Sequence, residues 1–524
     1  MSSSVDSFLC GEWKKGKGEA STLFNPSTEE ALSEASTAGL DLGAAVRFGR
    51  EKGGPALRGM TFAQRAELLK KLAKGVADLR EELIRVGIDN AGNTRSDAKF
   101  DIDGASATLL YYADLGQKLG DARVLPDGEA QPIGRSARLY GQHVLLPREG
   151  VAVHINAFNF PAWGMAEKLA VTLLAGMPAI TKPATATAMM AHRIVQRWVE
   201  EKILPEGALQ FVGGSVGDLL AHLRGQDVVA FTGSGQTATQ LRRHENLARH
   251  HVHLNVEADS LNAAILGPDV QDGSEAMNLF LAEVVKEITQ KAGQKCTAVR
   301  RIYVAKERMD AVRDALVERL RETRVGNPAD EKVTMGPLAT AAQLKDVREG
   351  IGRLAGGAEV AIGGAGAPEQ VLGAPAGKGF FVAPTLLVHR AALPAGHPVN
   401  EIEVFGPVAS MLPYGGAEEL AAQVAAGGGG LVSAVYSDDK EFVQKVVLGI
   451  APYHGRVTIG GEKVAGQTVP PGTVMPQLLH GGPGRAGGGE ELGGARGMAL
   501  YQQRTALQGP RAVIEQLVGA PAAK

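Results

Sequence analysis

The chain has 524 residues, 44% of them hydrophobic and 21% charged, so it can bury a large core but is too long for one compact domain. Lys and Arg number 55 against 57 Asp and Glu, and the resulting formal charge of -2 argues against nucleic acid or an anionic membrane surface as the main partner. Because no apolar run approaches the roughly 20 residues that span a bilayer, and the two cysteines have no disulfide or zinc spacing, we expect a soluble cytoplasmic protein with free thiols.

Two extended segments lie far apart in the sequence and have no helical partner. Residues 136–150 hold strand-like runs, and ALYQQRTALQG near the C-terminus is another isolated extended candidate. We predict that they form a small protruding sheet, with 131–148 and 498–515 as oligomerisation strands, because exposed sheet edges usually find a partner.

Between residues 151 and 257, strand-like and helix-like stretches alternate. This spacing predicts an α/β fold with a parallel sheet covered by helices, of the Rossmann type, and we assign residues 1–130 and 149–258 to a dinucleotide-binding domain. Ligands of such sheets lie beyond the carboxyl ends of the strands. The segments at those ends are NAFNF, Lys182, GGSVG, FTGSG and Glu257. Gly233 to Ala238 fits the Gly-x-Gly-x-x-Ala fingerprint, but it follows the fourth strand, so a simple tight turn remains an equal alternative.

A second α/β domain is expected over residues 259–480. Ser274 can cap a helix with apolar positions at helical spacing, and Gly293 is a plausible end for it. Cys296 then falls in the connection to the strand-like VRRIYVAK. Residues 481–497, GGPGRAGGGEELGGARG, are too rich in glycine to form one regular element.

Three residues are candidates for chemistry. Cys296 on a connecting loop can be a nucleophile, although taken alone an inert core thiol is the commoner case. Glu257 at a strand end can act as a general base, or simply cap a helix or pair with a cation. The Asn159 amide can donate to an oxyanion, or serve as a turn residue.

No metal ligands are predicted. His251 and His253 would share one face of a strand, but no acidic or cysteine ligand accompanies them locally. Cys10 lies in a polar N-terminal arm without a base or positive cluster, and we treat it as incidental.

Six separated motifs occur in the order that is typical of the aldehyde dehydrogenase superfamily, which the chain resembles over nearly its whole length. They are Asn159-Phe160-Pro161, Lys182-Pro183, Phe231-Thr232-Gly233-Ser234, Val256-Glu257, Gly293-Gln294-Lys295-Cys296 and Glu403-Val404-Phe405-Gly406-Pro407.

The resemblance implies a role for each motif. Cys296 would attack the aldehyde, with Asn159 and the Cys296 N–H holding the oxyanion, and Glu257 would activate the water that hydrolyses the thioester. The cofactor would be held by Glu403 and Phe405 at the nicotinamide end, by Lys182 at the adenosine ribose, and by Gly233 and Ser234 at the pyrophosphate. Phe158 and Trp163 would line the substrate tunnel. A homodimer is also implied.

Two departures from the family pattern sharpen the expectation. Many members have Glu two residues after the Lys-Pro pair, where this chain has Thr185. A neutral hydroxyl does not repel a ribose 2′-phosphate, so we predict NADP over NAD, with NAD as the weaker alternative.

The shortened run Ala258-Asp259-Ser260-Leu261-Asn262 and the glycine-rich segment resemble a branch that oxidises CoA-linked semialdehydes, such as 3,4-dehydroadipyl-CoA semialdehyde of aerobic benzoyl-CoA degradation. Three alternatives stay open: a general NAD(P) enzyme for free aldehydes, an acylating enzyme in which CoA replaces water, and a non-catalytic relative that keeps the fold.

Overall fold

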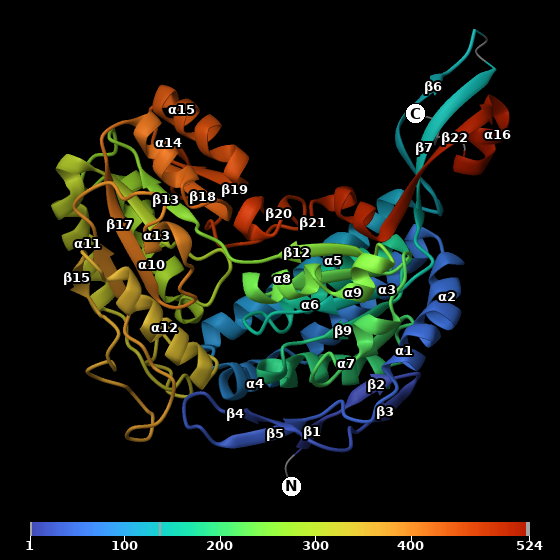
Figure 1. Cartoon of the computed structure of the whole chain (residues 1–524), viewed down its shortest axis with the longest axis horizontal. Coiled ribbons are helices and arrows are strands. Elements are labelled where there is room, and N and C mark those ends of the chain that lie inside the picture. The colour runs from blue at the N-terminus through green and yellow to red at the C-terminus, as the bar shows by residue number, and fades with distance from the viewer. Residues whose placement is uncertain (1–2, 136–137, 520–524) are drawn as a thin grey trace.

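The computed structural model describes residues 3–135 and 138–519 and consists of two lobes and a protruding arm (Figure 1). Each lobe is built on a seven-stranded sheet, and a three-stranded sheet forms the arm. The predicted strand range 131–148 includes residues 136 and 137, which lie outside the described residues. The α/β class with a Rossmann-type parallel sheet and a second α/β lobe is confirmed.

The first sheet has the strand order β12-β11-β8-β9-β10-β2-β3. Its first five strands are parallel, and β2 and β3 join antiparallel at one edge. Because β8 comes first in the chain among the parallel strands and lies between β9 and β11, the direction of winding reverses beside it. Such a switch point opens a crevice at the carboxyl ends of the strands. The strands are β2 (Ser7–Leu9), β3 (Glu12–Lys14), β8 (Ala152–Ile155), β9 (Ala179–Lys182), β10 (Leu209–Phe211), β11 (Val228–Thr232) and β12 (His253–Glu257).

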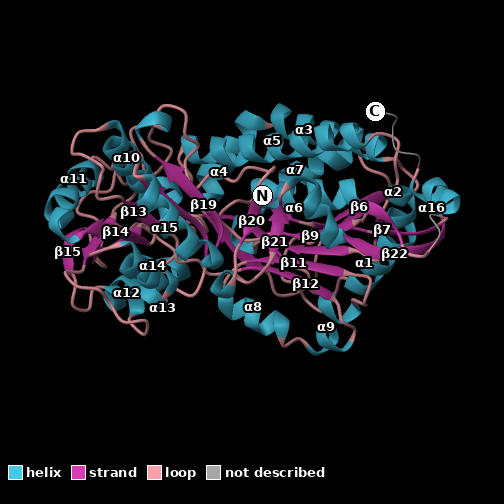
Figure 2. Ribbon diagram, turned by 90° about the horizontal axis from the view of Figure 1, so that it is seen from above, coloured by secondary structure: helices cyan, strands magenta, loops and turns pink. Residues whose placement is uncertain are grey.

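Helices cover both faces of this sheet (Figure 2). Every residue of α6 except Gly164 is buried, which fits its almost continuous apolar sequence. The stretch between β11 and β12 forms two short helices, α8 and α9, and the stretch between β10 and β11 contains a 3-10 turn, Leu219–His222. The helices are α1 (Leu42–Phe48), α2 (Gly54–Arg58), α3 (Phe62–Asp78), α4 (Arg80–Ala91), α5 (Arg95–Leu119), α6 (Trp163–Ala175), α7 (Ala188–Glu200), α8 (Gly235–Arg242) and α9 (Glu245–Arg249).

The second lobe is also built on a seven-stranded sheet, with the strand order β15-β16-β17-β14-β13-β18-β19. Only β15, at one edge, is antiparallel to its neighbour. The strands are β13 (Ala263–Leu266), β14 (Arg301–Ala305), β15 (Glu359–Ile362), β16 (Thr385–Val388), β17 (Val408–Tyr414), β18 (Gly430–Tyr436) and β19 (His454–Gly460). The helices are α10 (Glu275–Thr289), α11 (Met309–Arg321), α12 (Ala341–Leu354), α13 (Pro398–Glu401), α14 (Ala417–Ala425) and α15 (Lys440–Ile450).

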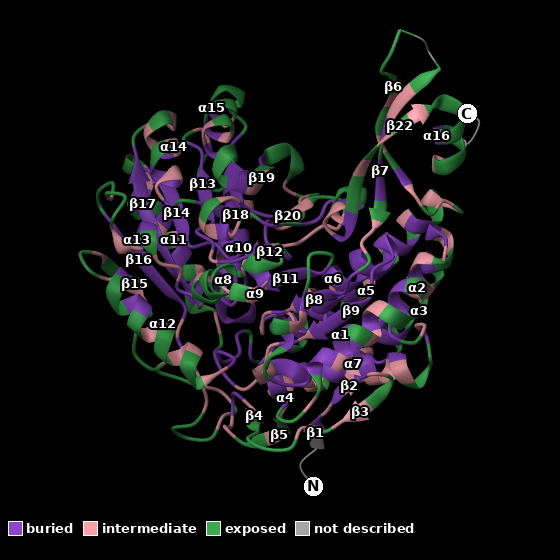
Figure 3. Ribbon diagram, turned by 45° about the vertical axis from the view of Figure 1, so that its right-hand side comes forward, coloured by how far each residue is buried: buried purple, intermediate pink, exposed green. Residues whose placement is uncertain are grey.

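The arm joins segments from distant parts of the chain, as the sequence predicted. In the order β22-β7-β6, β22 (Gln502–Pro510) pairs antiparallel with β7 (Leu139–Pro147), and β6 (Leu125–Pro132) covers the other side. The strand β6 begins six residues ahead of the predicted boundary at 131. Figure 3 shows the arm standing away from the buried interior, with α16 (Arg511–Val518) against it.

Two small sheets complete the fold. The strands β1 (Ser3–Val5), β4 (Ser21–Phe24) and β5 (Ala31–Ala35) form one, and β20 (Leu479–Gly481) with β21 (Glu490–Leu492) forms the other. No helix within the described ranges has the length and apolar character needed to cross a bilayer.

Candidate active site

Cys296 stands in a tight turn between α10 and β14. Ser274 caps α10 by accepting a hydrogen bond from the Met277 N–H, as predicted. The helix ends at Thr289, earlier than Gly293, and Lys291, Ala292 and Gly293 then take left-handed backbone angles. A Cβ at Gly293 would lie 2.1 Å from the Gly406 carbonyl oxygen, so only glycine fits there. The turn places Cys296 at the cleft between the two lobes.

Glu257 ends β12, and the glycine-rich segment 481–497 packs directly on that strand. A Cβ at Gly487 or Gly489 would lie 2.3 or 2.4 Å from the Val256 carbonyl oxygen. The Ala258 N–H donates to the Ala486 carbonyl, and the Gly489 N–H donates to that of Val256. The glycines therefore allow two backbones to lie side by side next to the carboxylate.

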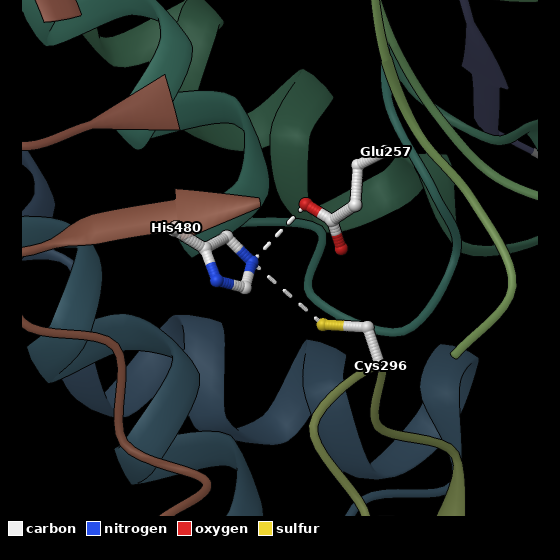
Figure 4. Close-up of side chains that lie close together, drawn as sticks. All are labelled: Glu257, Cys296 and His480. Carbon is white, nitrogen blue, oxygen red and sulfur yellow. Dashed lines mark hydrogen bonds and ion pairs between the residues drawn. The ribbon is translucent and has the colours of Figure 1, made fainter. Parts of the chain in front are cut away.

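This close packing brings a third side chain to the site, His480 on β20. Its Nε2 lies 3.1 Å from Oε2 of Glu257 and 3.9 Å from Sγ of Cys296. Figure 4 shows that one ring nitrogen faces both groups. All three side chains are buried or nearly so. A thiol, an imidazole and a carboxylate in this arrangement are equipped for nucleophilic catalysis.

The charges of this cluster act on one another. Burial raises the pKa of Glu257, but the charges of His480 and Lys168 outweigh burial and lower that pKa to about 2. Burial lowers the pKa of His480, and the Glu257 carboxylate more than reverses this, so the pKa of His480 is raised. Burial and the Glu257 charge both raise the pKa of the Cys296 thiol well above its ordinary value. The thiol thus needs a proton acceptor before it can act as a nucleophile.

A second group of charges lies behind the cluster. The Lys168 ammonium on α6 donates to Thr232 Oγ1 at 2.8 Å and to Glu491 Oε2 at 3.1 Å, and Glu167 lies 3.5 Å away. Burial raises the pKa of Glu167 to about 7. In the antiparallel pair of β20 and β21, Glu491 is the partner of His480.

Asn159 lines the same pocket as Cys296 and Glu257, in the loop that follows β8. The pocket thus brings together the three residues that were predicted to be catalytic. Aromatic side chains form the outer wall, where Phe160 and Trp163 meet edge to face with their ring centroids 6.0 Å apart. Phe158 instead lines the neighbouring cleft and meets the Phe405 ring at 5.7 Å.

That cleft, of about 710 Å³, runs along the carboxyl ends of β8, β9, β11 and β12. Five of the six predicted cofactor residues line it: Lys182, Gly233, Ser234, Glu403 and Phe405. Thr185 is not among the lining residues; it begins a short 3-10 turn, Thr185–Thr187, just after the lining residue Ala184.

The side chains of the cleft suit a dinucleotide. Burial lowers the pKa of Lys182 to about 8, and its ammonium is held by the Pro183 carbonyl at 2.7 Å. Ser234 caps α8, whose N-terminus opens beside the cleft. Burial raises the pKa of Glu403 to about 7, although Arg300 and the Ser260 N–H contact its carboxylate. A buried cation, a helix N-terminus and a carboxylate therefore match phosphate and ribose groups. Cys296, Glu257 and Asn159 line the inner end of the cleft.

The histidines near residue 250 lie away from this site. His251 and His253 are exposed, and His251 precedes β12 with a left-handed backbone. Among the described residues, the groups whose ligand atoms lie within 4.8 Å of one another are Glu257, Cys296 and His480, and Glu167, Glu257 and Glu491.

Sequence reasoning did not identify His480, Lys168, Glu167 or Glu491. His480 directly precedes the glycine-rich segment and Glu491 lies within it, and that segment was interpreted only as irregular; Glu167 and Lys168 lie within α6. Clustered glycines often mark a place where two backbones approach closely. The sequence did not show which element packs against this segment.

Comparison with known proteins agrees with this geometry. The sequence pattern of the "Aldehyde dehydrogenase family" matches residues 13–506. A "3,4-dehydroadipyl-CoA semialdehyde dehydrogenase" from Aromatoleum evansii is 44% identical over 476 residues, covering 91% of this chain and 92% of that protein. The NAD+ complex of an aldehyde dehydrogenase from Bacillus cereus superposes with a TM-score of 0.82 at 25% identity, covering 97% of this chain and 96% of that one. A putative aldehyde dehydrogenase from Burkholderia cenocepacia superposes with a TM-score of 0.83 at 24% identity, covering 97% of each chain.

Proposed function

Because the chain belongs to the aldehyde dehydrogenase family, and is therefore an oxidoreductase that acts on aldehydes, we propose that it oxidises a CoA-linked semialdehyde to the carboxylic acid with NADP. The observation that carries the proposal is the shared position of three residues. Cys296, Glu257 and Asn159 line both the buried pocket and the inner end of the cofactor cleft. An aldehyde in the pocket would therefore meet the thiol and the cofactor at one point.

In the first step, the thiolate of Cys296 adds to the aldehyde carbon and forms a thiohemiacetal. The Asn159 amide and the Cys296 N–H hold the oxyanion, an interaction worth about 3 to 4 kcal/mol per donor in comparable sites. The bound nicotinamide supplies a hydride acceptor. Cys296 is then left as a thioester.

Deacylation needs a base that stays ionised, and Glu257 has that character. The lowered pKa of Glu257 keeps the carboxylate charged at neutral pH, so it can take a proton from the attacking water. An attacking CoA thiolate would need no such base. The buried carboxylate beside Cys296 therefore favours hydrolysis to the acid over transfer to CoA.

Cofactor preference rests on the end of the cleft near β9. Lys182 is the buried cation there, and a neutral Thr185 follows it in the next turn. With no carboxylate at position 185, Lys182 is free to pair with a ribose 2′-phosphate. This supports NADP.

The CoA-linked substrate is supported by the relative from A. evansii, whose name states that it acts on 3,4-dehydroadipyl-CoA semialdehyde. We propose the same substrate for this chain.

A homodimer formed through the arm is part of the proposal, because the arm leaves Ile133, Leu139 and Leu146 between 37% and 46% exposed. The two free thiols support a reducing, cytoplasmic setting.

A steady-state assay tests the proposal. Purified protein is given 3,4-dehydroadipyl-CoA semialdehyde, the matching free semialdehyde or a short aliphatic aldehyde, and NADPH and NADH are measured separately. We expect the CoA-linked substrate with NADP to give the highest kcat/KM by at least about a hundredfold. Equal efficiency with short aldehydes and NAD would leave only a general aldehyde dehydrogenase.

The route of deacylation is tested with Glu257→Gln. We expect one burst of NADPH per active site, followed by negligible turnover, because the thioester forms but is not hydrolysed. Glu490→Gln, which alters the exposed carboxylate next to Glu491, is the matched control and should turn over normally. Turnover of the wild-type protein that depends on added CoA would point instead to the acylating reaction.

A further inference from the structure

His480 has no part in the reaction derived so far, yet its side chain lies beside both Cys296 and Glu257. It lies on β20, directly before the glycine-rich segment, and only 4% of its surface is exposed. Its Nε2 points between Sγ of Cys296 and Oε2 of Glu257 (Figure 4). A buried imidazole between a thiol and a carboxylate is placed to exchange a proton with either.

The thiol of Cys296 has two candidate acceptors, and their positions distinguish them. If Glu257 took the thiol proton, the thiolate would face a neutral carboxyl and a neutral imidazole. If His480 takes it, the thiolate and the carboxylate each face the new imidazolium. The second outcome places one cation between two anions, the better arrangement for buried groups.

We propose that His480 is the base that activates Cys296, which leaves Glu257 free to act on water. In this step the S–H bond of Cys296 breaks, its proton binds Nε2 of the neutral imidazole, and the electron pair stays on sulfur as the thiolate. The net charge of the cluster does not change. The inference rests on the proposed role of Cys296 as nucleophile.

Two bases then serve two steps. Oxidation of an aldehyde to an ionised acid with one water releases two protons, and both come from the water because the thiol is regenerated. His480 holds the thiol proton while the thioester exists, and Glu257 accepts a proton from the attacking water. When the thioester is hydrolysed, the released thiolate again faces the His480 imidazolium and can recover its proton. Neither base has to be cleared of its proton between the two steps.

Other charged groups also act on the imidazole. Glu167 on α6 raises the pKa of His480, and Arg456 on β19 lowers it. Lys168 and Glu491 lie behind them and are paired with each other. These groups remain in place in the variants below, so a change in pH dependence can be assigned to His480 or Glu257.

The test measures the reactivity of the thiol alone, without substrate or cofactor. In a Cys10→Ser background, Cys296 is the sole thiol, and its rate of alkylation by iodoacetamide is followed across pH. We expect His480→Gln to slow alkylation at neutral pH by about tenfold or more and to move the profile to higher pH, as a rise of one pKa unit requires. Glu257→Gln should not slow it.

Controls separate chemistry from folding. His253→Gln changes an exposed histidine on the same strand as Glu257 and should react like the background protein. The ultraviolet absorbance of the thiolate, taken as the difference from Cys296→Ser, should fall in His480→Gln by the same factor as alkylation. His480→Asn provides a smaller polar replacement if the glutamine variant does not fold.

Either of two results overturns the proposal. One is an unchanged alkylation profile in a folded His480 variant. The other is slowed alkylation in Glu257→Gln alone, which would make Glu257 the base for both steps. The proposed function fails by a different measurement, namely continued aldehyde oxidation by Cys296→Ser.

Discussion

Lys295 and Cys296 are neighbours in the chain, but their side chains enter two very different buried clusters. The Lys295 ammonium contacts Glu287 at 2.8 Å and Gln290 at 2.9 Å, and the side chains of the ion pair are at most 1% exposed. Cys296 instead faces Glu257 and His480 and lines the pocket. The first cluster is a closed ion pair, and the second leaves groups facing a cavity.

A closed ion pair directly beside the open cluster lets a rigid turn hold a reactive group. The closed pair of Lys295 anchors the turn to α10, so the next residue can face the cleft without moving. In the open cluster, neither carboxylate oxygen of Glu257 has a hydrogen bond to another side chain in good geometry, although Nε2 of His480 lies 3.1 Å from Oε2. Buried groups left in this way are costly for stability and useful for chemistry. We therefore expect substitutions in the two clusters to affect different properties.

Removing the nucleophile should have the largest effect, and only on activity. We expect Cys296→Ser to lower kcat by about 10⁴-fold or more, because a hydroxyl is a far weaker nucleophile than a thiolate. Its free energy of unfolding should change by less than about 1 kcal/mol. NADPH formation and urea-induced unfolding check the two expectations. A large loss of stability would mean that the thiol is a packing residue.

Breaking the closed pair should have the opposite signature. We expect Lys295→Met to lower the free energy of unfolding by about 3 to 5 kcal/mol, because Glu287 is left as an unpaired buried charge. The double variant Glu287→Leu/Lys295→Met should recover part of that loss. Unfolding in urea measures both. A single variant that is as stable as the wild type would contradict the assignment of this pair to structure.

The oxyanion donor should have an intermediate effect. We expect Asn159→Ala to lower kcat by about 10²- to 10³-fold with a small change in KM, since the amide acts on charge that develops during the reaction. Comparing kcat and KM for one substrate checks this. If KM rose and kcat stayed the same, Asn159 would bind the substrate and have no role at the oxyanion.

The smallest effect is expected at the cofactor. Thr185→Glu places a carboxylate near Lys182, and we expect the ratio of kcat/KM for NADP over NAD to fall by about tenfold, or about 1.4 kcal/mol. Thr185→Gln is the neutral control of equal size. Because Thr185 does not line the cleft itself, an unchanged ratio in Thr185→Glu would place cofactor choice elsewhere.

Much of the site could be predicted because it lies on regular elements. Glu257 and Lys182 end parallel strands, and strand ends of such a sheet meet at one edge, so their approach followed from the alternating pattern. The same pattern placed Asn159 after the first strand. Helix boundaries were less accurate: α10 ends at Thr289, ahead of the predicted Gly293, because the chain needs three left-handed residues to turn toward the cleft.

The sequence by itself determined the α/β class, the pairing of distant strands in the arm, and Cys296, Glu257 and Asn159 as the candidate catalytic residues. Periodicity, strand-end positions and ordered motifs are local properties, and local properties can be detected in one chain. Only the tertiary structure placed His480 between Cys296 and Glu257, because that contact joins residues 184 positions apart through a glycine-rich segment with no periodicity of its own. Electrostatic neighbours depend on which backbones can approach closely, and that is decided when the whole chain packs.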